Sequence, residues 1–207
     1  MSQKLLEVTN LSMHYDTLDG NVDAVKNVSF TVNSGESFGL VGESGCGKTS
    51  VAMTLLQLQP DNSVITEGSI KLEGKELIGL SENDLRKVRW DSISIVFQGA
   101  MNAWNPVIKI GEQIREAMRE HYPQNSKQEN INKINGLFKM VGLDESISER
   151  FPHELSGGMK QRAVIALALS CDPKIIIADE PTTALDVTVQ KTILELMQQT
   201  QGNLKEL

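Results

Sequence analysis

The chain has 207 residues, 40% of them hydrophobic, and this composition excludes a fibrous or wholly disordered protein while fitting one compact domain or a core with one inserted subdomain. The formal net charge is −7, which argues against a dedicated nucleic-acid-binding domain, because such domains usually present a basic surface. The longest apolar stretch, Ala163 to Leu169, is far shorter than the roughly 20 residues of a membrane helix, and we expect no secretory signal because no apolar core follows Lys4 in the first seven residues. We therefore expect a cytoplasmic protein that serves a membrane only from its surface, through partners.

The first half of the chain alternates predicted strands with turns. Short apolar runs, or alternation of apolar and polar residues, predict strands over residues 5–15, 22–32, 37–41, 69–72 and 92–97. Asn33 to Glu36 form a turn, and a glycine-rich loop after Val41 leads into a helix that we expect to end at Leu58. The predicted apolar face of this helix consists of Val51, Ala52, Leu55 and Leu56.

Helical patterns dominate the second half of the chain. The predicted helices cover residues 110–120, 128–141, 159–169 and 187–199, and a buried strand is predicted over 174–178. Strands that alternate with helices favour an α/β core with a parallel sheet. We therefore expect a core with a β subdomain, residues 1–98 and 159–207, and a helical insert, residues 99–158.

Residues 42–49, called the phosphate loop below, read GESGCGKT and fit the pattern G-x-x-x-x-G-K-[ST] between an apolar strand and an amphipathic helix. Glycines let several backbone N–H groups point at one anion, and the following helix adds the positive end of its dipole. Lys48 supplies a charge for the β- and γ-phosphates, and the Thr49 hydroxyl can ligate Mg²⁺. We interpret Cys46 as a passive small residue rather than a redox switch. The predicted nucleotide-binding residues of this segment are Gly42, Glu43, Ser44, Gly45, Cys46, Gly47, Lys48, Thr49 and Ser50.

An apolar strand, Ile175 to Ala178, ends in the two acidic residues Asp179 and Glu180. At the carboxyl end of a parallel strand, Asp179 would face the same crevice as the phosphate loop. There it can hold Mg²⁺ through water, while Glu180 can polarise an attacking water. Taken alone, two acidic residues after a strand more often mark only a solvated strand end. The phosphate loop in the same chain favours the interpretation that they act on Mg²⁺ and water.

The segment Leu155–Arg162 reads LSGGMKQR and opens a helix. Ser156 is a natural N-cap, and Gly157 and Gly158 leave the first N–H groups uncovered, so this is a second helix end that can bind an anion. The alternative is a capped helix with a flexible entry. Because one nucleotide cannot easily use both helix ends of one subunit, the pattern suggests that the second end binds a nucleotide held by another subunit.

Together these motifs resemble the ATP-binding-cassette (ABC) ATPases. The phosphate loop, Gln98, LSGGMKQR, IIIADE at 175–180 and Ala184-Leu185-Asp186 occur in the family's order over essentially the whole chain. The segments 98–106 and 179–188 are most similar to the ATPases of dipeptide and oligopeptide importers, a subgroup that includes nickel and oligosaccharide importers. The resemblance implies an α/β fold: a P-loop NTPase core with a parallel sheet, an N-terminal antiparallel β subdomain and an inserted α-helical subdomain.

The resemblance also implies roles for single residues. Tyr15 would stack on adenine, its alternative being a strand-edge aromatic. Gln98 would sense Mg²⁺ and the γ-phosphate and relay their presence toward the membrane subunits, and Asp186 would help couple the two sites of a dimer. Trp104 either lies against a membrane-subunit helix or packs in the core, and we interpret His153 as structural. The residues that would contact the partner subunit's ATP are Ser156, Gly157, Gly158 and Gln161.

The implied function is that of an ATP-binding and ATP-hydrolysing subunit that energises uptake of peptides or related solutes from the cytoplasmic face of the cell membrane. Two such subunits, identical or paralogous, would close head to tail around two ATP molecules and move the membrane permease subunits, with a solute-binding protein as an indirect partner. The implied catalytic residues are Glu180, Lys48 and Gln98, and the implied Mg²⁺ ligands are Thr49, Gln98 and Asp179.

One departure from the family pattern concerns a histidine that normally follows a further strand and contacts the γ-phosphate. All three histidines of this chain, His14, His121 and His153, precede the acidic strand. We therefore expect a C-terminally truncated cassette with weak or no hydrolysis, and one alternative is a non-catalytic fragment that regulates a partner. A second alternative is a soluble cassette ATPase of translation or DNA repair, against which segment 98–106 and the acidic charge argue.

Overall fold

The computed structural model describes residues 3–97, 99 and 103–180 of the chain. These residues fall into two compact units, Met1–Arg86 and Lys87–Leu207, and each unit is described by itself. Within the described ranges, no helix is long and apolar enough to cross a membrane. The helix predicted over 187–199 lies outside them.

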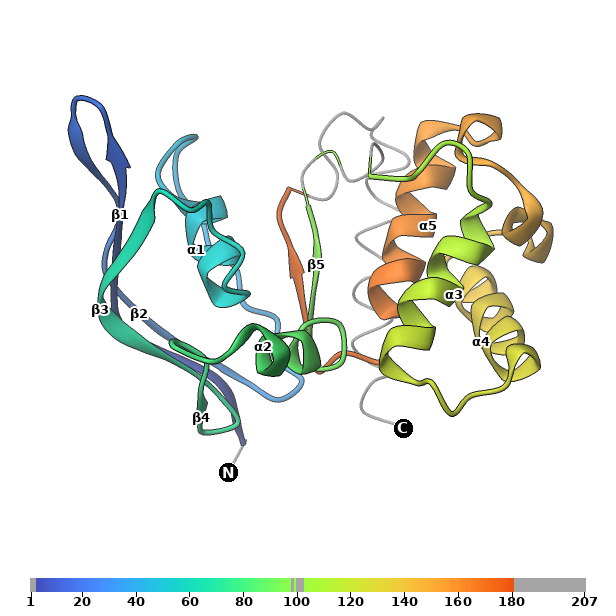
Figure 1. Cartoon of the computed structure of the whole chain (residues 1–207), viewed down its shortest axis with the longest axis horizontal. Helices are drawn as coiled ribbons and strands as arrows, with labels where there is room; N and C mark the ends of the chain where they lie inside the picture. The colour runs from blue at the N-terminus through green and yellow to red at the C-terminus, as the bar shows by residue number, and fades with distance from the viewer. Residues whose placement is uncertain (1–2, 98, 100–102, 181–207) are drawn as a thin grey trace. The chain divides into compact units, whose positions relative to one another are not determined.

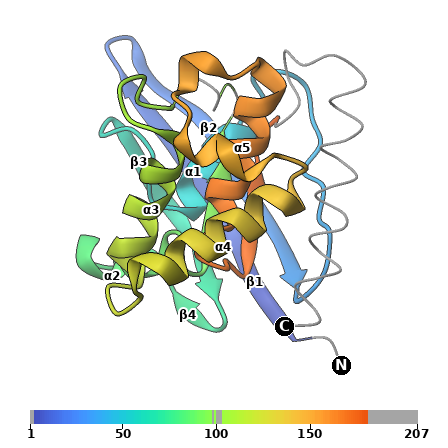
Figure 2. The same ribbon diagram turned by 90° about the vertical axis from the view of Figure 1, so that its right-hand side faces the viewer.

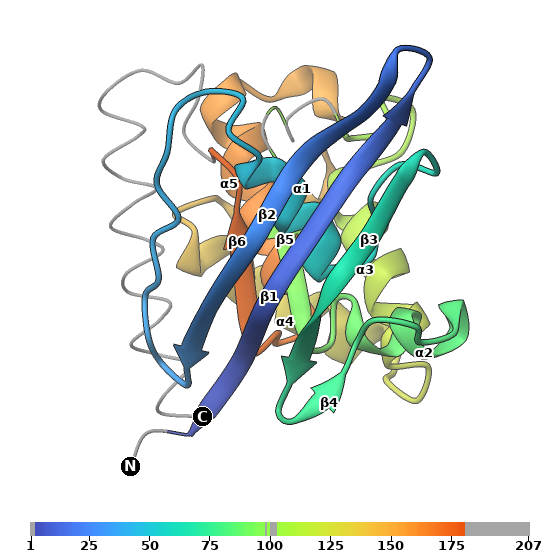
Figure 3. The same cartoon turned by 90° about the vertical axis from the view of Figure 1, so that its left-hand side faces the viewer.

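The first unit contains a four-stranded antiparallel sheet (Figure 3). Its strands are β1 (Lys4–Thr17), β2 (Gly20–Asn33), β3 (Ser63–Leu72) and β4 (Lys75–Glu76), in the order β2-β1-β3-β4. β1 and β2 form a hairpin in which Leu11 lies opposite Val28 and Tyr15 lies opposite Val22. The N-terminal antiparallel sheet is confirmed. Its most deeply buried side chains are Leu6, Val8, Leu11, Met13, Val25 and Ile70.

Helix α1 (Lys48–Leu55) lies on one face of this sheet (Figures 1 and 3). The predicted apolar face is confirmed, because the buried residues include Val51, Ala52, Leu55 and Leu56. The predicted end at Leu58 is wrong, since the helix ends at Leu55. Gln57 adopts a left-handed φ of 51°, and the Leu58 N–H turns back to donate to the carbonyl oxygen of Met53 at 2.9 Å, which closes the last turn.

Residues 37–41 do not form the predicted strand. The described sheets consist of β1 to β4 and of β5 with β6, and the segment belongs to neither. An apolar run suggests a strand, but a strand exists only where a neighbour continues its ladder of backbone hydrogen bonds. Here Leu40 and Val41 are 42% and 92% exposed, and Phe38 instead stacks on Phe30 of β2 with ring centroids 4.9 Å apart.

The second unit contains a parallel pair of strands, β5 (Ile93–Val96) and β6 (Ile175–Ala178). Ile93 lies opposite Ile175 and Val96 opposite Ala178. Parallel neighbours need a long crossover connection, and the helical stretch between the two strands supplies it. The strands predicted over 92–97 and 174–178 are confirmed, as is their parallel arrangement.

Helices of the second unit pack side by side (Figures 1 and 2). They are α3 (Ile110–His121), α4 (Lys127–Met140) and α5 (Gly157–Leu169), with 3-10 helices at Glu145–Glu149 and Pro152–Glu154. α4 begins with a capping box, in which the Ser126 hydroxyl oxygen accepts from the Glu129 N–H at 3.2 Å and the Ser126 N–H donates to the Glu129 carboxylate at 2.6 Å. The fully buried side chains of this helical core include Ile110, Ile114, Met118, Ile134 and Phe138.

The three described helices confirm the predictions over 110–120, 128–141 and 159–169, with ends shifted by less than one helical turn. Sequence patterns did not predict α2 (Glu82–Val88), which crosses the boundary between the two units, or the two-residue strand β4. The limits of the helical insert, 99–158, stay a prediction.

Candidate functional site

The phosphate loop is a tight turn whose path depends on glycine. Gly47, the N-cap of α1, has φ 93° and ψ 9°, and a Cβ there would lie 2.1 Å from the carbonyl oxygen of Ala24 on β2. At Gly42, a Cβ would lie 2.5 Å from the Cys46 Sγ. The Cys46 N–H donates to the Glu43 carbonyl at 3.3 Å and closes the loop. Replacing Gly42 or Gly47 with any larger residue would therefore displace the Cys46 side chain or the Ala24 carbonyl group.

Lys48 is the first residue of α1 and folds its side chain back over the loop. Its Nζ donates to the carbonyl oxygens of Gly42 and Glu43 at 3.0 and 2.8 Å, and it lies 3.9 Å from the Cys46 Sγ. The ammonium group is thereby held at the same end of α1 as the N–H groups of the first helical turn.

The donor set of this loop fits a phosphate group. No side chain caps α1 at Gly47, and the first N–H groups of a helix have no acceptor within the helix. Ser44, Gly45 and Thr49 are exposed, so the loop is open to solvent. Backbone N–H groups, the positive end of a helix dipole and an ammonium group together favour a polyanion.

Tyr15 lies on β1, and its hydroxyl oxygen is 3.0 Å from the Ser50 Oγ. Because Ser50 belongs to the first turn of α1, this contact holds the aromatic ring close to the start of the helix that carries Lys48. The two residues are 35 positions apart, and no local sequence signal predicted their contact. The structure thus brings Tyr15 to the phosphate loop, while its stacking on adenine stays a prediction.

The acidic pair follows β6 in the second unit. Asp179 is buried, at 9% exposure, and its N–H donates to the Val96 carbonyl oxygen at 2.9 Å, which continues the ladder between β5 and β6. Glu180 is exposed and has a left-handed φ of 47°, so its backbone is no longer in the extended conformation of a strand. The carboxyl groups therefore occupy the end of the parallel strand pair.

The LSGG segment begins α5 as expected. Ser156 is the N-cap, and its hydroxyl oxygen accepts from the Met159 N–H at 3.3 Å. Ser156 and Gly157 are exposed and Gly158 is half-buried. Gln161 is 3% exposed, so it is the one member of the predicted set that the single chain does not present at its surface.

The structure decides between the two interpretations of Trp104. This side chain is 6% exposed, belongs to the helical core, and donates from Nε1 to the Lys160 carbonyl oxygen at 3.4 Å. Trp104 therefore packs in the core. His153 is exposed and stacks its ring on Phe151 with centroids 5.7 Å apart.

The remaining site predictions are not tested by these contacts. Gln98 and Asp186 lie outside the described residues. Within those residues, no cluster of three or more His, Cys, Asp or Glu side chains is arranged to hold a metal ion. Thr49 belongs to the first unit and Asp179 to the second, and their joint binding of Mg²⁺ stays a prediction.

The chain belongs to the ABC transporter family, which matches residues 25–183. This range contains the phosphate loop, the LSGG segment and the acidic end of β6. Among solved structures, the chain is similar to the dimeric structure of MJ0796, a bacterial ABC transporter cassette, with a TM-score of 0.85 and 30% identity over 96% of this chain and 84% of that one. It is also similar to the post-hydrolysis state of the same cassette bound to ADP and Pi, with a TM-score of 0.82.

Curated relatives are more similar in sequence. The chain is 46% identical over 196 residues to the oligopeptide transport ATP-binding protein AppD of Bacillus subtilis (strain 168), an alignment that covers 93% of this chain and 60% of AppD. It is 43% identical over 205 residues to the dipeptide transport ATP-binding protein DppD of Lactococcus lactis subsp. cremoris (strain MG1363), covering 98% and 58%. The chain thus spans about 60% of the length of these relatives.

Proposed function

We propose that the chain is the ATP-binding and ATP-hydrolysing part of an ABC importer subunit that energises uptake of peptides or related solutes. The observation that carries this proposal is the phosphate loop, in which an uncapped helix N-terminus and the Lys48 ammonium group lie at the same end of α1. The names of AppD and DppD support the solute class.

Each predicted residue has a chemical task in this proposal. Backbone N–H groups of the phosphate loop bind the triphosphate, and Lys48 neutralises its charge. The Thr49 hydroxyl, Gln98 and Asp179 would hold Mg²⁺, Asp179 through a water molecule, and the ion would offset the negative charge of the phosphate oxygens. Glu180 orients or deprotonates the water that attacks the γ-phosphate. Such a reaction needs placement and charge more than covalent catalysis.

The predicted partners follow from the LSGG segment. Ser156, Gly157 and Gly158 contact the ATP of a second ATPase subunit, so that two subunits close head to tail. Gln161 is buried in the single chain and joins this contact only if the start of α5 opens around it. The similarity of the chain to the MJ0796 cassette, whose structure is dimeric, supports a second ATPase subunit as a partner. Gln98 relays nucleotide occupancy to membrane permease subunits, and the ATPase therefore lies at the cytoplasmic face of the membrane.

Titration of the purified chain with MgATP tests the binding step. We expect saturable binding that Lys48→Ala removes, because the loop loses its ammonium group, whereas Lys139→Ala on the exposed side of α4 retains it. Phosphate release then tests hydrolysis, which the departure from the family pattern predicts to be slow in this chain. Glu180→Gln is expected to bind MgATP as the natural chain does and to release phosphate more slowly still. Equal MgATP affinity in the natural chain and in Lys48→Ala contradicts the proposal.

The importer assignment needs a separate experiment. The tagged chain is incubated with membranes that contain the permease subunits of a peptide importer, with ribosomes and with DNA, in parallel. We expect retention by the permease membranes alone. Retention by ribosomes or DNA instead would favour a soluble cassette ATPase and contradict an import role.

A further inference from the structure

Asn62, in the turn between α1 and β3, makes a contact that none of the predicted site residues explains. Its backbone carbonyl oxygen accepts from the Asp16 N–H at 2.7 Å, and its side-chain Nδ2 donates to the Asp16 carbonyl oxygen at 2.9 Å. Both polar groups of the Asp16 backbone are thereby bound by a single residue. Asp16 immediately follows Tyr15, the residue expected to stack on the base.

This contact extends the sheet by one rung beyond its last backbone pair. The register of β1 with β3 ends where Tyr15 lies opposite Ser63, and β3 begins at Ser63. In an antiparallel pair of strands, every second pair of directly opposed residues exchanges both N–H···O bonds. At Asp16 the Asn62 side-chain amide supplies the second of these bonds, so the side chain completes a rung that the backbone leaves open.

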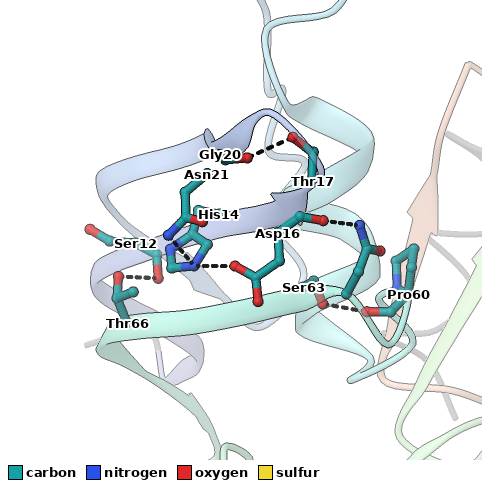
Figure 4. A network of polar contacts seen from close by, with 10 residues as sticks. Ser12, His14, Asp16, Thr17, Gly20, Asn21, Pro60, Ser63 and Thr66 are labelled. Atoms are coloured by element: carbon teal, nitrogen blue, oxygen red, sulfur yellow. Dashed lines mark hydrogen bonds and ion pairs between the residues drawn. The ribbon is translucent and has the colours of Figure 1, made fainter.

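The turn that carries Asn62 is itself fixed by hydrogen bonds (Figure 4). The Ser63 N–H and the Ser63 hydroxyl both donate to the Pro60 carbonyl oxygen, at 2.9 and 2.6 Å. On the other side of Asp16, its carboxylate lies 3.0 Å from the His14 Nε2. The strand end next to Tyr15 is therefore held from the α1–β3 turn as well as from its own hairpin.

The strand end at Tyr15 and Asp16 is consequently held at two points, one on α1 and one in the turn between α1 and β3. The Tyr15 hydroxyl contacts Ser50 at the start of the helix, and the neighbouring Asp16 is bound by Asn62 in the segment that leaves the helix. An aromatic ring stacks well only when its plane is held in place, since stacking depends on ring geometry. We propose that Asn62 is a positioning residue that sets the Tyr15 ring for stacking on the nucleotide base. The proposal rests on the nucleotide-binding function proposed above.

The test compares a ligand that has a base with one that has none. Calorimetric titrations measure the Kd of MgATP and of magnesium tripolyphosphate for the natural chain, Asn62→Ala and Asn135→Ala. Asn135 is the matched control, because its Nδ2 donates to the Glu145 carboxylate at 2.9 Å in the second unit. For Asn62→Ala we expect the Kd of MgATP to rise between about twofold and tenfold, the range of one lost hydrogen bond. The Kd of tripolyphosphate should stay unchanged, and Asn135→Ala should change neither.

A double-mutant cycle separates positioning from general damage. In a Tyr15→Ala background, Asn62→Ala should weaken MgATP binding no further, because the ring it positions is gone. If Asn62→Ala does not fold, Asn62→Asp keeps the side-chain shape without the amide donor and takes its place. An unchanged Kd of MgATP, equal weakening of both ligands, or full additivity with Tyr15→Ala overturns the proposal. A natural chain that binds neither ligand overturns the proposed function itself.

Discussion

We expect Gly47→Ala to destabilise the protein, because two separate features of the phosphate loop oppose a side chain at this position. The first is the left-handed φ of 93°, which costs an L-residue about 1–2 kcal/mol. The second is the Ala24 carbonyl oxygen, which lies 2.1 Å from the added Cβ and must shift. Overpacking of this kind costs about 1–3 kcal/mol, and the stiffer unfolded chain returns about 0.4–1 kcal/mol. We therefore expect a net loss of about 1–5 kcal/mol in the free energy of unfolding.

Gly45→Ala is the matched control for this change. Gly45 has a similar φ of 80°, but no atom lies within 4 Å of its added Cβ. Its expected cost is the backbone strain less the unfolded-state gain, about 0–1.5 kcal/mol. The difference between the two variants therefore isolates the contact between the loop and β2.

Urea unfolding of the natural chain, Gly45→Ala and Gly47→Ala measures these free energies. For a domain of this size, each kcal/mol lowers the unfolding temperature by about 2–4 °C, which provides an independent check. MgATP binding should weaken in Gly47→Ala, because a shifted N-cap displaces the first N–H groups of α1. Equal stability of the two variants would refute the reasoning, since the close approach to Ala24 would then carry no energy.

Two further predictions concern pH. Burial, and after it the nearby Asp91 carboxylate, raises the pKa of Tyr122 from 10.0 to about 12. The protonated phenol therefore stabilises the folded protein below pH 10, and this stabilisation is lost as the pH rises towards about 12. In urea unfolding, Tyr122→Phe should remove this part of the loss of stability at alkaline pH. Burial of Glu76 opposes ionisation, but hydrogen bonds from the Ser69 hydroxyl and the Ile70 and Ile78 N–H groups outweigh it and lower its pKa below 4.5. The ionised Glu76 carboxylate therefore stabilises the folded protein above pH 4.5, and this stabilisation is lost as the pH falls through the lowered pKa. Glu76→Gln should make the free energy of unfolding less dependent on pH in the acid range, and an unchanged pH dependence contradicts the assignment.

Elements with a repeated hydrophobic pattern were predictable because burial produces that pattern. α3 buries Ile110, Ile114 and Met118, which are spaced so that they share one face of a helix. The strand over 37–41 failed for the opposite reason. Its apolar run carries no information about a neighbour, and a strand depends on that neighbour for its hydrogen bonds.

The short elements that were missed do carry local signals. Glu73 and Gly74, between β3 and β4, have φ values of 49° and 80°, and positive φ at both positions is the mark of a two-residue hairpin turn. Before α2, the Ser81 Oγ accepts from the Asp84 N–H at 3.2 Å, which is an N-cap contact. Both signals span only a few residues, too few for a periodic pattern to reveal the element.

Contacts around the site were less predictable than its residue types. The motif identifies Lys48 from sequence because the chemistry of phosphate binding restricts which residues can occur there. The Tyr15 contact with Ser50 and the Asp16 contact with Asn62 join positions 35 and 46 residues apart. Such pairs depend on how β1, α1 and β3 are assembled. Tyr, Ser, Asp and Asn occur in many other settings, so the residue types alone do not point to these contacts.

The two helix N-termini differ in what they offer an anion. α1 begins at Gly47 without a side-chain cap, so no capping side chain competes with a ligand for its first N–H groups. α5 begins at Ser156, whose hydroxyl oxygen already accepts from the Met159 N–H. A serine hydroxyl that accepts one hydrogen bond still has its own proton to donate. The LSGG helix can therefore keep its cap while donating from Ser156 to a phosphate oxygen, which fits the proposed contact with a nucleotide bound to a second subunit.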